Sequence, residues 1–180
     1  MFKKILIALV LLLAAFAGAV AMQPDELHVE RSATIAAEPA AVFAQVNDFH
    51  RWQEWSPWTR LDPEAKNSFE GPEAGKGAIF RWAGNAQVGE GSMTIVESRP
   101  DELIRIHLEF VKPFEGTNNV LFTFKPEGDG TLVTWDMLGK KNFVCKAMCL
   151  VMNMQKMIGS EFDQGLANLK GVVEQQKPAG

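Results

Sequence analysis

The chain has 180 residues, of which 47% are hydrophobic and 22% are charged, with a formal net charge of −4. This length is enough for one domain with a real hydrophobic core. The acidic excess argues against a nucleic-acid partner, because a polyanion would be repelled rather than bound.

The first 22 residues form an apolar leader. Lys3 and Lys4 precede an unbroken apolar run of 18 residues, Ile5 to Met22, which includes Ala19-Val20-Ala21 near its end. A charged start, an apolar segment and an A-x-A site are typical of an export signal. Because such a run also reaches the lower limit for crossing a bilayer, two interpretations stay open: cleavage after Ala21, or retention as a membrane anchor. Both predict an exported domain, either periplasmic or anchored with the domain on the outer side of the membrane.

The folded domain is expected at residues 27–174, followed by a disordered tail at 175–180. Alternating residues predict a first strand from His28 to Ala37. Glu38-Pro39 then begins a helix that ends at Asn47-Asp48, since proline suits the first helical turn. A short helical turn from His50 to Trp55 must stop before Pro57, because the residue preceding a proline disfavours the helical region.

Residues 78–137 alternate between apolar and polar side chains, which predicts strands of a sheet with one covered face. The connections are short, so we expect an antiparallel meander. The strands are centred on five segments: Ala78–Ala83, Gly91–Val96, Ile104–Phe110, Val120–Phe124 and Val133–Met137.

One long helix, Asn142 to Glu174, is predicted to close the chain. Its apolar residues recur at spacings of three and four, as expected for a helix that packs on a sheet. Gly159, Gly165 and Gly171 each cost about 1 kcal/mol of helix propensity, which suggests a close approach to a strand or a slight bend. The predicted fold class is therefore α+β: a curved antiparallel sheet wrapped around a long C-terminal helix, with two short helices near the N-terminus.

Several motifs carry a family likeness. They are the proline-led helix with Val42-Phe43, the run from Trp52 to Pro57, the segment Gly130-Thr131-x-Val133-x-Trp135, and Gly165-Leu166-x-x-Leu169 in the closing helix. Together they resemble the polyketide cyclase/dehydrase group of the START/Bet v 1-like (SRPBCC) superfamily. The resemblance implies a helix-grip fold that holds lipids, quinones, hormones or polyketides between helix and sheet, and in a few members performs cyclisation.

The candidate ligand-binding residues lie on the predicted inner surface. Trp52, Trp55 and Trp58 recur every three residues, and either pack in the core or contact a ligand. Flexible methionines of the closing helix suit an irregular cavity. The complete candidate set is Trp52, Trp55, Trp58, Phe80, Trp82, Met93, Ile106, Leu108, Phe110, Phe122, Phe124, Trp135, Met148 and Met152.

Reactive groups do not converge in the sequence pattern, so no catalytic residue is assigned. His50 and Glu54, near the tryptophans, are the weak candidates. Cys145 and Cys149 lie four apart, and we interpret them as free thiols, with a redox-active pair as the alternative. No metal site or cofactor is expected.

The leading hypothesis is therefore a carrier or sensor that binds a hydrophobic small molecule or lipid in a cavity between the sheet and the closing helix. The alternatives are a polyketide cyclase/dehydratase-like enzyme and a membrane-tethered structural or interaction module. A membrane is a further partner if the leader is uncleaved, and the sequence favours no particular oligomeric state.

Overall fold

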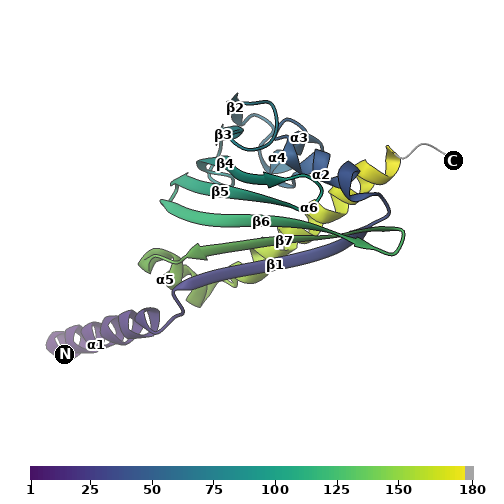
Figure 1. Cartoon of the computed structure of the whole chain (residues 1–180). Coiled ribbons are helices and arrows are strands. Elements are labelled where there is room, and N and C mark those ends of the chain that lie inside the picture. Colours follow the sequence, from purple (N-terminus) through teal and green to yellow (C-terminus); the bar gives the residue numbers. More distant parts are fainter. Residues whose placement is uncertain (177–180) are drawn as a thin grey trace.

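The computed structural model describes residues 1–176, apart from the side chain of Val151. A curved antiparallel sheet carries the helices α2, α3, α4 and α6 on one face, and α1 projects from one end of the domain (Figure 1). The helix-grip fold predicted from the sequence is confirmed.

Within residues 1–176 the sheet has seven strands in the order β1-β7-β6-β5-β4-β3-β2, and every neighbouring pair is antiparallel. Because β1 pairs with β7, the first two strands lie at opposite edges and α2, α3 and α4 connect them. The strands are β1 (Glu26–Ile35), β2 (Lys66–Glu70), β3 (Ile79–Ala83), β4 (Glu90–Arg99), β5 (Leu103–Lys112), β6 (Gly116–Glu127) and β7 (Gly130–Lys140).

Alternation along the strands separates an inner apolar face from an outer polar face. On β5, Ile104, Ile106 and Leu108 are buried, whereas Arg105 and His107 face outward. Burial of the inner side chains stabilises the fold by about 25 cal/mol for each Å² of apolar area removed from water. A shift of register by one residue would turn these side chains outward and lose this stabilisation.

The helices follow their local signals. Pro39 opens α2 at its first turn, and Pro57 separates two single-turn helices. The helices are α1 (Phe2–Ala21), α2 (Pro39–Asn47), α3 (Trp52–Trp55), α4 (Trp58–Leu61), α5 (Phe143–Val151) and α6 (Met154–Gln175).

The prediction of one unbroken closing helix is wrong, because the chain breaks between α5 and α6. Met152 has an extended backbone, and the Asn153 side chain accepts a hydrogen bond from the backbone N–H of Lys156 at 2.9 Å. Asparagine is a favoured N-cap, and this cap starts a new helix. The apolar spacing continues across the break, so periodicity alone did not reveal it.

Two other boundaries differ from the predictions. β2 was missed because Phe69 is its only partly buried residue, so this edge strand has no apolar alternation. β1 starts and ends two residues before the predicted first strand. At the chain end, α6 includes Gln175, and residues 177–180 of the predicted tail lie outside the described residues.

Candidate functional site

The space between α6 and the sheet contains a stack of aromatic rings. Trp135 of β7 lies flat against Phe162 of α6, with ring centroids 4.1 Å apart and planes 9° apart. Trp52, Trp55 and Trp58 each contact Trp135 at centroid distances of 6.2, 5.7 and 5.8 Å. The three tryptophans spaced in the sequence therefore converge on one inner-face ring.

Trp52 and Trp55 are buried, and their indole N–H groups donate to the backbone carbonyls of Val46 and Gln45. Such bonds fix the rings in place, so these two residues anchor the short helix α3 to the core. Trp58 is only partly buried and lies at the margin of the ring stack.

The expectation that α6 spans the sheet without filling the space beneath it is wrong at this position. Gly165 of α6 allows the close approach, because a Cβ there would lie 2.8 Å from Cζ3 of Trp135. The centre of the expected cavity is therefore occupied by the protein's own aromatic side chains.

The inner face is less completely covered on β2 to β5. A continuous row of half-buried aromatic residues, Phe69, Phe80, Trp82 and Phe110, crosses these strands. Their successive centroid distances are 5.3, 5.9 and 5.7 Å. We call these four residues the aromatic row.

The aromatic row is continuous because of strand register. Trp82 and Phe110 are both paired with Gly91 of β4, whose missing side chain leaves room for the Trp82 ring. Met93 is partly buried and is register-paired with Phe80. The arrangement offers an apolar, partly accessible surface of rings and a flexible thioether, which suits an apolar ligand.

The remaining predicted residues divide into two groups. Ile106, Leu108, Phe122 and Phe124 are buried in the core on the inner face. Met148 and Met152, by contrast, belong to α5 and to the break after it, not to the helix that spans the sheet, and Met152 is 41% exposed.

A cleft of about 300 Å³ opens where the α2–α3 connection faces the β2–β3 edge. His50 lines it, stacks on Phe69 with centroids 4.0 Å apart, and its Nδ1 lies 2.9 Å from Oδ1 of Asp48. Glu54 is exposed and is not among the residues that line this cleft. The structure therefore does not join the two weak catalytic candidates in one site.

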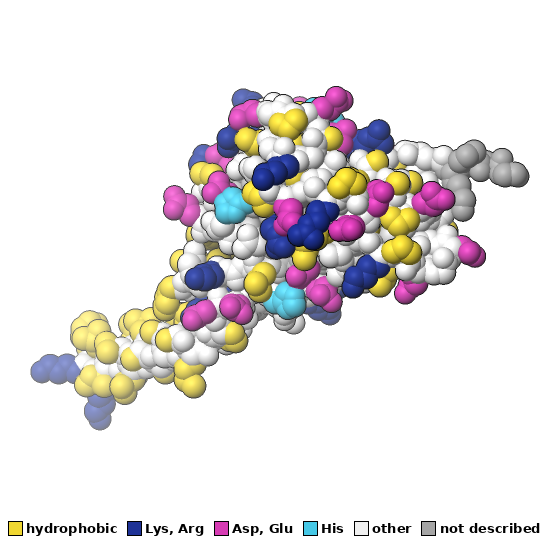
Figure 2. Space-filling view, in the orientation of Figure 1, with side chains coloured by type: hydrophobic (Ala, Val, Ile, Leu, Met, Phe, Trp, Pro, Cys, Tyr) yellow, Lys and Arg dark blue, Asp and Glu magenta, His cyan; other side chains and the backbone are white. Residues whose placement is uncertain are grey.

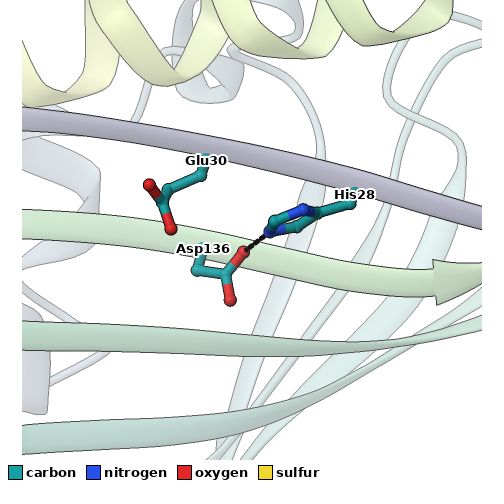
Figure 3. A group of neighbouring side chains, drawn as sticks. All are labelled: His28, Glu30 and Asp136. Carbon is teal, nitrogen blue, oxygen red and sulfur yellow. Dashed lines mark hydrogen bonds and ion pairs between the residues drawn. The ribbon is translucent and has the colours of Figure 1, made fainter.

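A second group of polar residues lies on the outer face of β1 and β7. His28, Glu30 and Asp136 point toward one another, and each offers a ligand atom within 4.8 Å of the others (Figure 3). Nε2 of His28 is 2.7 Å from Oδ1 of Asp136. One imidazole and two carboxylates are groups that can bind a divalent metal.

Sequence reasoning missed this group because Asp136 is more than 100 residues from His28. Only the β1–β7 register, in which Glu30 faces Asp136, brings them together. The adjoining surface depression is also lined by Arg31 and Lys156, whose positive charges oppose a cation.

Comparison with known proteins agrees with this architecture. The fold defines a helix-grip protein of the START/Bet v 1-like superfamily. Residues 26–174 match the model of the family described as "Polyketide cyclase / dehydrase and lipid transport", and the chain belongs to this family. No curated protein matches the sequence.

Solved structures share the fold at low sequence identity. A crystal structure of protein CV1439 from Chromobacterium violaceum is 18% identical, with 84% of this chain and 99% of that chain covered and a TM-score of 0.57. The Aha1 dimer from Colwellia psychrerythraea is 12% identical, with 82% and 96% covered and a TM-score of 0.59. Ara h 8.0201 is 12% identical, with 84% and 99% covered and a TM-score of 0.59.

Family and fold together support a hydrophobic ligand-binding domain or a polyketide cyclase-like role. The 20-residue apolar helix α1 has the length and composition of a signal peptide or a signal anchor. Any proposed function must therefore account for an apolar ligand or a cyclase-like reaction, and for the apolar helix at the N-terminus.

Proposed function

We propose that this protein binds a hydrophobic small molecule or lipid against the aromatic row, outside the membrane to which its leader directs it. One observation carries the proposal: four aromatic residues of β2, β3 and β5, with Gly91 of β4 between Trp82 and Phe110, form a continuous inner-face surface that stays partly accessible. The proposed site lies to one side of the cavity predicted from the sequence, because Trp135 and Phe162 occupy the centre of the space under α6.

Binding would come mainly from apolar contact. Aromatic side chains contribute large areas at low entropic cost, and the row is held in advance by strand pairing and by the bond from Nε1 of Trp82 to the carbonyl of Val88. His50, the titratable side chain that stacks on Phe69 of the row, is paired with Asp48 at 2.9 Å. Arg81 and Glu70 pair with each other at 2.9 Å on the opposite face of β2 and β3. This arrangement favours holding a ligand over transforming it.

The test is to purify the full chain in mild detergent, identify co-purifying lipids by native mass spectrometry, and titrate a hydrophobic fluorescent probe. Phe110→Ala should weaken probe binding by roughly tenfold, because about 1.4 kcal/mol of apolar contact is lost. Leu121→Ala is the matched control, since Leu121 is also half-buried but faces outward from the neighbouring strand.

Equal binding by both variants, or a protein that repeatedly emerges empty and ignores the probe, would contradict the proposal and favour an interaction module. The same samples also test a cyclase-like role, for which His50, the titratable ring that lines the cleft, is the candidate residue. A bound ligand that loses the mass of one water on the original protein but not on H50Q would assign chemistry to His50.

A further inference from the structure

Helix α5 presents an unusual surface. Seven of the eight residues from Phe143 to Leu150 are apolar, yet none of the eight is buried. An apolar helix in a water-soluble fold normally packs its side chains inward. On α5, Phe143, Val144 and Leu150 are 58%, 40% and 38% exposed.

These side chains share one side of α5. Phe143, Ala147 and Leu150 follow the spacing of four and three that aligns residues along a helix, and Val144 lies beside them. Val111, Phe114, Met152 and Met157 are further exposed apolar residues in the segments that border α5. The amide of Asn142 donates to the carbonyl of Glu115, which fixes the start of α5 beside the β5–β6 turn that holds Phe114.

The position of α5 is coupled to α1. Residues 22–25 are the only link between α1 and β1, and such a link spans at most about 14 Å. The backbone N–H of Lys141 donates to the carbonyl of Asp25 at 2.7 Å, so this link also holds the start of α5. Val20, at the end of α1, is fully buried.

The single charged residue of α5 is neutralised locally. The Lys146 side chain is only 13% exposed and forms an ion pair with Asp25. The hydrogen bond from Lys146 and its positive charge lower the pKa of Asp25. Because Lys146 is paired with Asp25, no unpaired charge of α5 opposes the transfer of its exposed apolar side into a lipid environment.

From this geometry we propose that α5 is an interfacial helix, seated in the outer surface of the same bilayer that α1 spans. The 20 residues of α1 extend about 30 Å, the thickness of a hydrocarbon core, so the short link holds α5 at the headgroup level. Figure 2 shows the hydrophobic surface of α1 leading up to the domain end that carries α5.

Lipid is the occupant that the observations favour. An apolar helix face seated among headgroups and acyl chains is the usual arrangement of interfacial helices, and flanking lysines such as Lys140 and Lys141 suit anionic headgroups. The inference goes beyond ligand binding by the aromatic row, because it concerns a different surface and is measured independently.

The experiment uses the full chain with both native cysteines replaced (C145A and C149A), inserted into phosphatidylcholine/phosphatidylglycerol vesicles. An environment-sensitive fluorophore is attached through V144C or, as the matched control, V96C. Val144 and Val96 are both valines, 40% and 39% exposed, but Val96 lies on β4, toward the opposite end of the strands. Lipids with a nitroxide near the headgroup should quench the label at position 144 and leave the label at position 96 bright.

A charge placed on α5 provides the second arm. Leu150→Glu should largely abolish quenching at position 144, because a carboxylate resists transfer into the interface. Leu61→Glu is its control, since Leu61 has the same 38% exposure but lies on α4. Circular dichroism verifies that each variant is folded, and flotation verifies that α1 remains inserted.

Three results would overturn the proposal. One is a label at position 144 that stays unquenched in vesicles that hold α1. Another is quenching that L150E leaves unchanged, which would assign it to α1 alone. The third is efficient cross-linking between V144C chains without quenching, which would make a second copy of the protein the occupant of this face.

Discussion

At the scale of single residues, the Asp25–Lys146 pair connects the leader to the domain. Asp25 is the last residue of the link between α1 and β1 and is largely exposed, whereas the Lys146 side chain on α5 is only 13% exposed. Without its carboxylate partner, the largely enclosed ammonium group of Lys146 would be left uncompensated, which would favour an open α5. The pair therefore favours an α5 that lies close to the end of α1.

Acid should loosen this connection. The pKa of Asp25 is lowered in the folded state, so its contribution is fully present above the ordinary value of 3.8 and is lost as the pH falls through the folded pKa. We expect hydrogen exchange of α5 amides to accelerate in that acidic window. Asp25→Asn should give fast exchange already at neutral pH, with no further acid step. A pH profile shared by both proteins would contradict this role.

At the scale of elements, the approach of α6 to β7 decides how the inner space is used. Gly165 faces Trp135 and Pro57, whereas the side of Gly171, on the same helix, is open, with nothing within 4 Å of a built Cβ. The two glycines have the same intrinsic cost in a helix and differ only in their surroundings. Substituting each glycine by alanine therefore distinguishes the effect of helix propensity on stability from the effect of packing.

Gly165→Ala should destabilise the domain by about 1–3 kcal/mol, since overpacking against Trp135 and Pro57 outweighs the gain of about 1 kcal/mol in helix propensity. Gly171→Ala should instead stabilise it by up to about 1 kcal/mol. Denaturant unfolding followed by tryptophan fluorescence measures both. Equal effects of the two substitutions would mean that α6 does not approach β7 this closely.

At the scale of the whole molecule, the two proposals depend on the leader in different ways: the aromatic row would bind the ligand, and α5 would lie in the membrane surface beside α1. The proposed position of α5 in the bilayer surface requires α1 to remain attached, so the proposal predicts a membrane anchor and not a cleaved signal. The aromatic row would then lie in a domain held permanently close to lipid, from which an apolar ligand could enter without crossing much water.

Retention of α1 is directly measurable. Intact-mass analysis of protein from the membrane fraction should give the full chain, and alkaline washing should not release it. The physical reason is that an inserted apolar helix of 20 residues leaves a bilayer at very high cost. A product that lacks residues 1–21 and is recovered in the soluble fraction would contradict both the anchor and the seat of α5.

Local pattern was enough to determine much of this protein. Period-two alternation identified the inner residues of β5, such as Ile104 and Ile106, because side-chain direction along a strand is set by the backbone itself. Proline positions located the start of α2 and the end of α3 for the same local reason. The apolar leader was equally evident from composition.

Contacts between distant segments were decided only by the tertiary structure. The Trp135–Phe162 stack occupies the centre of the expected cavity because Gly165 leaves room for the Trp135 ring against α6, and no single segment of the sequence specifies this contact. The group of His28, Glu30 and Asp136 depends on strand register across more than 100 residues. The exposure of α5 likewise follows from the break at Met152, because sequence periodicity describes which residues share a side but not what lies opposite them.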